Sequence, residues 1–390
     1  MRTSKLITFT LFVGVVCMSL RHASAGIFDF LDSISVSGTS YSDNGVTVSH
    51  IHTFKHPCHL FSLNWSPDGR YLTAGGVGCV KERVWDYENK SIIMSTDKED
   101  NGGFGIGFTP DSRYVISSSS LRATRENKLA NTVWEVQSGK PIKHLKGFHE
   151  LPQANNSKSI VPDSKGKYVF LDGGGIPAVK VLDAKTFEYV RGLQIEGKYS
   201  SPLNIKVHPQ GRFLAVDTRM SKETARATGG FGAVQVWNYE TGELIKQFPA
   251  QTGGVNNLAY SPDGRYLATG GENGHSTRLV SGEPLVTLHD DDLVRVWDTT
   301  TFNLAWSYIL DGAHVIEGMS YSPDGRFLIA TTWRYVYVLD AKSNKVLLSF
   351  QTPQDKTKLL FHPRENIFAV SGDELITIWK IEDSGTAPTY

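Results

Sequence analysis

The 390-residue chain carries 40 Lys and Arg residues against 40 Asp and Glu residues, so its formal net charge at neutral pH is zero. Because there is no basic surplus to neutralise phosphates, nucleic acids and anionic membrane surfaces are poor candidate partners. A local basic patch would still act independently of this sum. The length would suit two average domains, but an internal repeat takes precedence over that expectation.

The first 25 residues have the organisation of a secretory signal peptide. Arg2 and Lys5 form a basic start, Leu6 to Val16 form an apolar run, and Ala23-Ser24-Ala25 is a small-residue exit. This order predicts cleavage before Gly26. The apolar run is shorter than the roughly 20 residues of a membrane span. We therefore expect an exported protein, periplasmic or secreted, that is not inserted in a membrane after cleavage.

Two alternatives to a cleaved leader remain open at this point. One is an uncleaved anchor, and the other is a lipid anchor at Cys17, which lacks the usual Leu and small residues before it. The leader carries three basic residues, Arg2, Lys5 and Arg21, and no acidic one, so cleavage leaves 37 basic against 40 acidic residues. The mature net charge is then about −3.

Residues 26–45 form an N-terminal segment in which Ile34 to Tyr41 alternate between apolar and polar side chains. The following Asp43-Asn44-Gly45 is a strong hairpin signal, and Val46 to Phe54 is typical of a single strand.

Residues 46–381 repeat one unit. It contains an alternating strand, a turn built on Pro-Asp-Gly-Arg, a second strand, a third strand ending near Trp-Asp, and a fourth strand. In the turn, proline sets φ, Asp or Asn caps the loop and glycine supplies a positive φ. Seven copies of the turn occur, at Ser66-Pro67-Asp68-Gly69-Arg70, Thr109-Pro110-Asp111-Ser112-Arg113, Val161-Pro162-Asp163-Ser164, His208-Pro209-Gln210-Gly211-Arg212, Ser261-Pro262-Asp263-Gly264-Arg265, Ser322-Pro323-Asp324-Gly325-Arg326 and His362-Pro363-Arg364-Glu365-Asn366.

A marker dipeptide follows each turn. The seven markers are Trp85-Asp86, Trp134-Glu135, Leu182-Asp183, Trp237-Asn238, Trp297-Asp298, Leu339-Asp340 and Trp379-Lys380. The turn prolines are 43, 52, 47, 53, 61 and 40 residues apart, and a floor near 40 with variable excess is typical of WD repeats.

The pattern predicts an all-β, seven-bladed β-propeller of four-stranded antiparallel blades. The seventh unit has only three strands before Ile381, so we expect the strand at Val46 to Phe54 to complete the last blade. Closure of this kind removes the open edges of an unfinished ring. A fifth, outermost strand from residues 34–41 is compatible with the hairpin signal, and residues 382–390 are expected to form a flexible tail.

These residues resemble the WD-repeat β-propellers over roughly Val46 to Ile381. The resemblance implies a disc with a central channel that holds protein or peptide partners on its faces, and the fold alone does not specify the function. It also implies structural roles for the turn and marker residues Asp68, Asp263, Asp324, Trp85, Trp237 and Trp297.

The chain departs from this family in two respects. The Gly-His pair expected before the first strand is largely absent, since only His56, His149 and His314 are loosely placed, so a full His-Ser-Trp hydrogen-bond network is not expected. Export is uncommon for the eukaryotic scaffolds and suits bacterial periplasmic propellers better.

The second, fourth and fifth units carry insertions between their second and third strands, at Leu121 to Asn131, Thr218 to Gly232 and Glu272 to Asp291. In the family this connection emerges on the same face as the linkers between blades. Loops on a rigid scaffold are the usual place for binding residues, and Arg there can grip a carboxylate bidentately. The candidate partner-binding residues are Arg122, Arg125, Lys128, Arg219, Lys222, Arg226, His275, Arg278 and His289. The alternative is that these charges only keep the loops soluble.

No metal or cofactor site is expected. His289 with Asp290, Asp291 and Asp292 suggests calcium or a transition metal, but the simpler interpretation is that Asp292 caps the turn into the next strand. Cys58-His59 lacks the second cysteine of a haem attachment site.

Cys58 and Cys79 are the cysteines that remain after cleavage of the leader. If Trp65 and Arg70 flank the first turn, residue i lies opposite roughly 135 minus i, which places Cys58 near Val77 and two positions from Cys79. In an oxidising compartment we expect a disulfide between them, closing a loop of about 20 residues and stabilising the fold by about 3 kcal/mol. Two free buried thiols are the alternative.

Enzyme motifs are missing, including His-Glu-x-x-His, Gly-x-Ser-x-Gly and Gly-x-x-x-x-Gly-Lys. Two hypotheses follow. A binding scaffold, which we favour, predicts exposed aromatic and Arg side chains on the long-loop face. A propeller enzyme, a hydrolase, lyase or quinone-dependent oxidoreductase, predicts carboxylates or histidines with perturbed pKa at the channel mouth.

Overall fold

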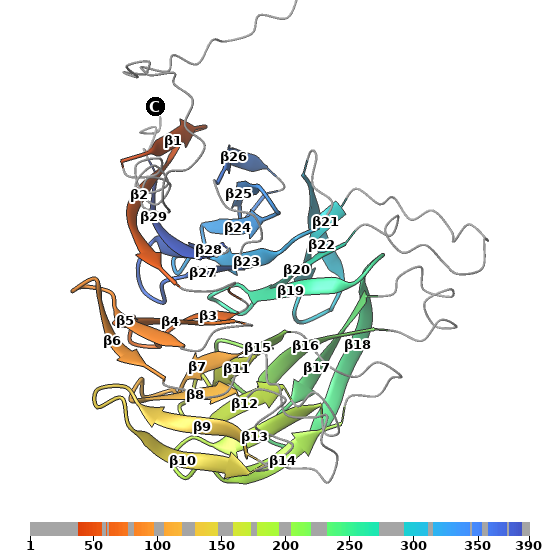
Figure 1. The fold of residues 1–390 in the computed structure, drawn as a ribbon. Helices are drawn as coiled ribbons and strands as arrows, with labels where there is room; N and C mark the ends of the chain where they lie inside the picture. The colour runs from red at the N-terminus through yellow and green to blue at the C-terminus, as the bar shows by residue number, and fades with distance from the viewer. Residues whose placement is uncertain are drawn as a thin grey trace, which may run out of the picture. The chain divides into compact units, whose positions relative to one another are not determined.

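The computed structural model describes residues 38–56, 60, 62–76, 82–96, 105–118, 129–146, 159–172, 178–194, 204–219, 232–272, 292–310, 315–343, 345–352, 358–372 and 374–383. Within these ranges the chain forms seven antiparallel sheets and no helix (Figure 1). The predicted all-β propeller of seven blades is therefore confirmed.

In blades 1 to 6 the strands run from innermost to outermost in chain order. Blade 1 contains β3 (Ser62–Trp65), β4 (Tyr71–Gly75), β5 (Arg83–Asp86) and β6 (Ser91–Ser95). Blade 2 contains β7 (Ile106–Phe108), β8 (Tyr114–Ser118), β9 (Leu129–Glu135) and β10 (Pro141–Lys146). Blade 3 contains β11 (Ile160–Pro162), β12 (Tyr168–Asp172), β13 (Val179–Asp183) and β14 (Tyr189–Leu193).

Blade 4 contains β15 (Ile205–Val207), β16 (Phe213–Arg219), β17 (Gly232–Asn238) and β18 (Glu243–Gln251). Blade 5 contains β19 (Val255–Tyr260), β20 (Tyr266–Gly271), β21 (Asp292–Asp298) and β22 (Leu304–Ile309). Blade 6 contains β23 (Gly318–Tyr321), β24 (Phe327–Thr331), β25 (Tyr335–Asp340) and β26 (Val346–Gln351).

Blade 7 joins the two ends of the repeat region. It contains β27 (Lys358–Phe361), β28 (Ile367–Ser371) and β29 (Leu375–Asp383), followed by β2 (Val46–Lys55) and β1 (Ser40–Asp43). β2 pairs antiparallel with β29, so the prediction that an N-terminal strand completes the last blade is confirmed. A fifth strand is also present as β1, which spans residues 40–43 and overlaps the predicted residues 34–41 at positions 40 and 41. Residues 34–37 lie outside the described ranges, and β29 extends two residues past Ile381.

The fifth strand also fastens blade 7 to blade 6. The Tyr41 ring stacks on Phe350 of β26 with ring centroids 4.3 Å apart. Asn44, in the turn between β1 and β2, donates from Nδ2 to the Leu347 carbonyl oxygen at 2.7 Å. Its backbone has φ of +46°, which asparagine tolerates in a hairpin turn.

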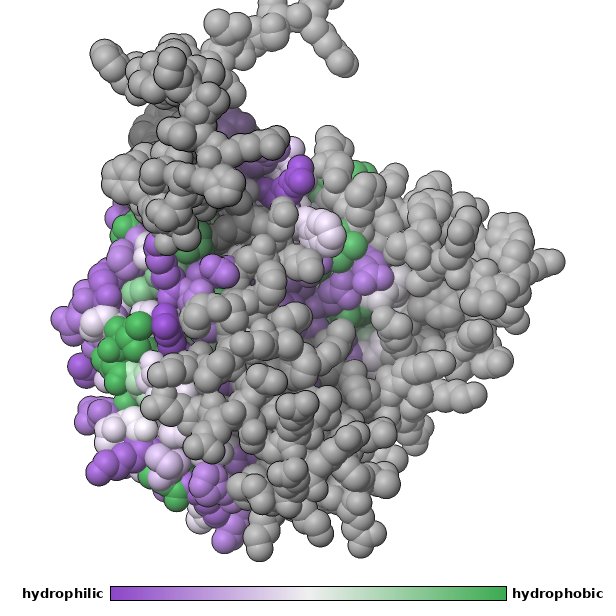
Figure 2. All heavy atoms as spheres, in the orientation of Figure 1, coloured by the Kyte–Doolittle hydropathy of each residue, from purple (hydrophilic) through white to green (hydrophobic). Residues whose placement is uncertain are grey.

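The inner strands close the ring. They contact one another in the order β3, β7, β11, β15, β19, β23 and β27, and β27 returns to β3 (Figure 1). Second strands such as β4 and β28 are buried along their whole length, because adjacent blades cover both of their faces. Outer strands begin exposed, and Figure 2 shows a hydrophobic patch over β6, where Ile92 is solvent-exposed.

The Ser-Pro-Asp-Gly-Arg turns join first to second strands by one repeated set of hydrogen bonds. In blade 1, Ser66 Oγ donates to Asp68 Oδ1 at 2.6 Å and accepts from the Tyr71 amide at 2.8 Å, and Asp68 Oδ1 also accepts from the Arg70 amide at 3.1 Å. The same bonds recur around Asp263 and Asp324. Each turn therefore satisfies its own polar groups locally.

The observed strand bounds change three details of the sequence analysis. The insertions do fall between second and third strands, but residues 129–131 belong to β9, 218–219 to β16 and 232 to β17. The intervals between strands are residues 119–128, 220–231 and 272–291, so the first two are shorter than the predicted insertions and the third coincides with its prediction. The assumed hairpin register was wrong, because Ser62 pairs with Gly75 and Trp65 with Leu72, so that residue i lies opposite 137 minus i.

Candidate functional site

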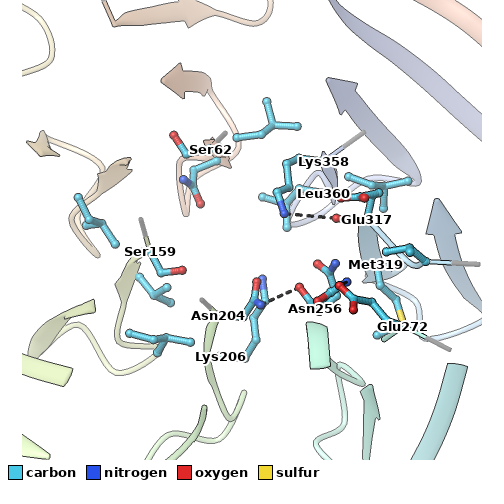
Figure 3. A pocket seen from close by; sticks show the side chains of 18 of the residues that line it. Ser62, Ser159, Asn204, Lys206, Asn256, Glu272, Glu317, Met319, Lys358 and Leu360 are labelled. Carbon is cyan, nitrogen blue, oxygen red and sulfur yellow. Dashed lines mark hydrogen bonds between the residues drawn. The ribbon is translucent and has the colours of Figure 1, made fainter. Parts of the chain in front are cut away.

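A cavity of about 460 Å³ opens where the inner strands begin, at the end of the central channel. We call it the channel mouth, and Figure 3 shows the side chains that line it. Most of its lining comes from the starts of the inner strands of blades 1, 3, 4, 5, 6 and 7 and from residues just before them, whereas Glu272 and Trp333 follow the second strands of blades 5 and 6. The lining residues are Ser62, Leu63, Asn64, Ser159, Ile160, Val161, Asn204, Ile205, Lys206, Asn256, Asn257, Glu272, Val315, Glu317, Met319, Trp333, Lys358, Leu359 and Leu360.

Strand direction places the channel mouth on a defined face. In an antiparallel blade the first strand begins at the end where the second strand finishes and the third begins. The connections between second and third strands therefore emerge on the same face as the channel mouth. We call this the long-loop face, since the longest of these connections, in blades 2, 4 and 5, belong to it.

Asparagine side chains connect neighbouring inner strands around the channel mouth. Asn64 Nδ2 donates to the Ile106 carbonyl oxygen at 2.7 Å, from blade 1 to blade 2. Asn204 Nδ2 donates to the Asn256 carbonyl oxygen at 2.7 Å, from blade 4 to blade 5 (Figure 3). Asn257 Nδ2 donates to the Ile316 carbonyl oxygen at 3.3 Å. Each of these amides thus uses at least one of its two N–H donors to connect neighbouring blades.

Four charged side chains also line the channel mouth. On the side of blades 5 and 6, Glu272 Oε1 accepts from Asn256 Nδ2 at 3.4 Å, and Glu317 Oε1 accepts from Trp333 Nε1 at 3.1 Å. Lys206 and Lys358 lie on β15 and β27. Burial, together with the positive charge of Lys358, lowers the pKa of Lys206 from 10.5 to about 8.

Most of the predicted partner-binding residues lie outside the described ranges. These are Arg122, Arg125, Lys128, Lys222, Arg226, His275, Arg278 and His289, and the same holds for Cys58 and Cys79. Arg219 is described only through its backbone, as the last residue of β16. In chain order the other eight candidate residues follow a second strand and precede a third, whereas Arg219 ends the second strand of blade 4.

The marker tryptophans lie between blades. Trp85 is buried against Phe54 of blade 7, with ring centroids 5.6 Å apart. Trp237 Nε1 donates to Gln235 Oε1 at 3.1 Å, and Trp297 Nε1 donates to Thr269 Oγ1 at 3.0 Å. Trp297 thus makes the indole-to-hydroxyl bond of the His-Ser-Trp network, which was not expected to be complete from the sequence. His56 lies near Trp85, with ring centroids 5.6 Å apart.

Two histidines link turns of neighbouring blades on the opposite face. His208, in the fourth turn, and His362, in the seventh, take the place of serine. Nε2 of His208 is 2.9 Å from the Gly264 carbonyl oxygen of blade 5. Nε2 of His362 is 3.0 Å from the Gly69 carbonyl oxygen of blade 1, across the junction where the ring closes.

Lys206 and Lys358 were missed by the sequence analysis. A usable signal was present, because each lysine occupies a short inner strand otherwise made of apolar residues, Ile205-Lys206-Val207 and Lys358-Leu359-Leu360-Phe361. An inner strand has the channel on one side, so a charged residue within it faces either the core or the channel.

None of the residues in the described ranges belongs to a helix with the length and hydropathy of a bilayer span. The same ranges hold no group of three or more His, Cys, Asp or Glu side chains arranged as metal ligands would be.

Residues 48–80 and 242–298 match the protein family described as "WD domain, G-beta repeat". Among curated proteins, the chain is 25% identical over 342 residues to Protein groucho of Drosophila melanogaster, which covers 85% of this chain and 40% of that protein. It is 22% identical over 341 residues to Actin-interacting protein 1 of the same species, covering 85% and 49%. It is also 22% identical over 321 residues to THO complex subunit 3 of Arabidopsis thaliana, covering 82% and 88%.

The chain spans less than half the length of the first two of these relatives. At these identities the likeness concerns the repeat and the fold. Together with the seven blades, the matches support the assignment of the chain as a WD-repeat β-propeller.

Proposed function

We propose that this protein is an exported binding scaffold that holds a protein or peptide partner on its long-loop face. The observation that carries the proposal is that the channel mouth and the long connections of blades 2, 4 and 5 share this face. A rigid ring with a polar cavity on the same face as its longest connections is suited to recognition, because loops on a rigid scaffold are the usual place for binding residues.

The relatives support a binding role in general terms. One is named for its interaction with actin, and another is named as a subunit of a complex. The candidate residues in the long connections supply Arg side chains, which suit an acidic partner. Export rests on the N-terminal sequence, with its basic start, apolar run and Ala23-Ser24-Ala25 exit.

A pull-down from the exported fraction of the native host tests the binding role. The mature protein is compared with a variant in which residues 121–127, 221–230 and 274–290 are replaced by short Gly-Ser turns, leaving every described strand intact. The control carries Lys185→Ala and Glu240→Ala in turns of the opposite face. We expect the intact protein and the control to retain the same partner and the trimmed variant to lose it. Retention by all three would refute the face assignment.

Export is tested separately by the intact mass of the protein recovered from cell fractions. We expect exported protein whose first residue is Gly26. Full-length protein found inside the cell would contradict this part of the proposal.

A second candidate function is catalysis at the channel mouth. It is favoured by Lys206, whose pKa burial and the Lys358 charge lower to about 8, and by the carboxylates of Glu272 and Glu317 in the same cavity. Lysine with a lowered pKa can act as a base or nucleophile. Under this alternative, hydrolase or lyase substrates would be turned over by the mature protein and not by Lys206→Met.

A further inference from the structure

Two lysine side chains enter the channel mouth from opposite walls. Lys206 belongs to the inner strand of blade 4 and Lys358 to the inner strand of blade 7. These blades are three positions apart in a ring of seven, so they lie on opposite sides of the channel. Both lysines line the same cavity, and Figure 3 shows their side chains extending into the space between the inner strands. The positive charge of Lys358 also contributes, after burial, to the lowered pKa of Lys206.

The positive charge of Lys206 is not balanced by a neighbouring group in the described ranges. Within the described ranges, its ammonium has neither a hydrogen-bond acceptor nor an ion-pair partner, whereas Lys358 Nζ donates to the Glu317 carbonyl oxygen at 3.4 Å. The carboxylates of Glu272 and Glu317 accept from Asn256 and Trp333. A desolvated cation without a partner is unfavourable, and a second cation nearby makes it more so.

We propose that the space between Lys206 and Lys358 binds the carboxylate of a ligand that enters the channel from the long-loop face. A carboxylate placed there is attracted by both ammonium groups, can accept a charge-assisted hydrogen bond, and relieves the repulsion between the lysines. The cavity of about 460 Å³ has the volume of an ordinary ligand site. Because Glu272 and Glu317 share the cavity, a singly charged carboxylate suits it better than a phosphate dianion.

The inference deepens the proposed function and rests on it only for the source of the carboxylate. The group could belong to a peptide partner, at its C-terminus, or to a free small acid. The chemistry of recognition is the same for both, and the experiment separates them.

The test measures how fast acetic anhydride labels individual lysines of the mature protein at pH 8, by mass spectrometry of digests. Exposed Lys246 is the internal reference. The probes are propionate, acetyl-triglycine with a free carboxylate, the amide of the same tripeptide, and inorganic phosphate. A bound carboxylate favours the charged ammonium, and a pKa rise of about one unit slows labelling of Lys206 about fivefold.

We expect the free-acid tripeptide to protect Lys206, its amide to leave it unprotected, and Lys246 to be unaffected. In the Lys358→Met variant the free-acid tripeptide should no longer slow the labelling of Lys206. This variant keeps Lys206, so its labelling rate can still be measured. Equal protection by propionate identifies a free small acid as the source, and protection by the tripeptide alone identifies a peptide chain end.

The inference is overturned if no carboxylate slows the labelling of Lys206, or if phosphate protects it and the carboxylates do not. It is also overturned if Lys358→Met leaves protection unchanged. Partner capture by the long loops is scored independently in the pull-down. Capture without carboxylate protection refutes only this inference, and protection without capture refutes only the proposed scaffold function.

Discussion

Gly69→Ala tests whether the turns of the opposite face also join one blade to the next. Gly69 has φ of +77°, where an L side chain is strained by about 1–2 kcal/mol. A Cβ at this position would also lie 2.6 Å from Cε1 of His362 and closer still to Nε2. The imidazole would have to leave its place, giving up its bond to the Gly69 carbonyl oxygen and its edge contact with Trp65.

Gly325→Ala is the matched control. Gly325 occupies the same position in the turn of blade 6, with φ of +70°, but the nearest atom to its Cβ would be Pro262 Cδ at 3.7 Å. Both substitutions carry the backbone strain, and only Gly69→Ala displaces a histidine. A lost hydrogen bond and a lost aromatic contact together make Gly69→Ala about 1–3 kcal/mol more destabilising than Gly325→Ala.

Denaturant unfolding, followed by tryptophan fluorescence and circular dichroism, measures both free energies of unfolding, with coincident transitions required. In a His362→Ala background the difference between the two substitutions should vanish, because the obstructing ring is gone. Gly264→Ala, which would collide with His208, should behave as Gly69→Ala does. Equal costs at Gly69 and Gly325 would refute the idea that the histidine links the blades.

Three further predictions concern pH, the contact between the β1–β2 turn and β26, and the cysteines. Burial lowers the pKa of His362 below 6.5, so the unfolded chain takes up the proton first and the stabilisation is lost as pH falls from about 6.5 through the folded pKa. Unfolding curves at pH 7.5 and 5.5 should show a smaller pH dependence in His362→Gln, and an unchanged one would contradict the assignment. Asn44→Ala removes the hydrogen bond to the Leu347 carbonyl oxygen of β26 and should lower the free energy of unfolding by about 1 kcal/mol. An unchanged free energy of unfolding would show that this contact between blades 7 and 6 does not stabilise the fold. If the β3–β4 register continued beyond the described residues, position 58 would lie opposite position 79, so we expect a Cys58–Cys79 disulfide in exported protein. Its reduction should add two hydrogens to the intact mass, and Cys58→Ser should cost about 3 kcal/mol, whereas two free thiols by mass would contradict it.

The blade count and the closure of the ring could be predicted from local signals. Proline, aspartate and glycine in each turn have fixed backbone preferences, and six of the seven markers stand at the end of a third strand in the structure. The strand at Val46 was assigned to the last blade because the seventh unit was one strand short. Exact register was harder, since a turn of this type admits more than one spacing, and the assumed one was wrong by two positions.

The sequence by itself thus determined the repeat, the strand order and the connections that carry the insertions, because these depend on neighbours along the chain. Only the tertiary structure decided the composition of the channel mouth. Lys206 and Lys358 belong to different blades and share a cavity only because the ring brings opposite inner strands to one axis. The bond from Asn204 to Asn256 and the bond from His362 to Gly69 likewise depend on the packing of one blade against the next. Such contacts join side chains that are far apart in the chain, and no local pattern of residues encodes them.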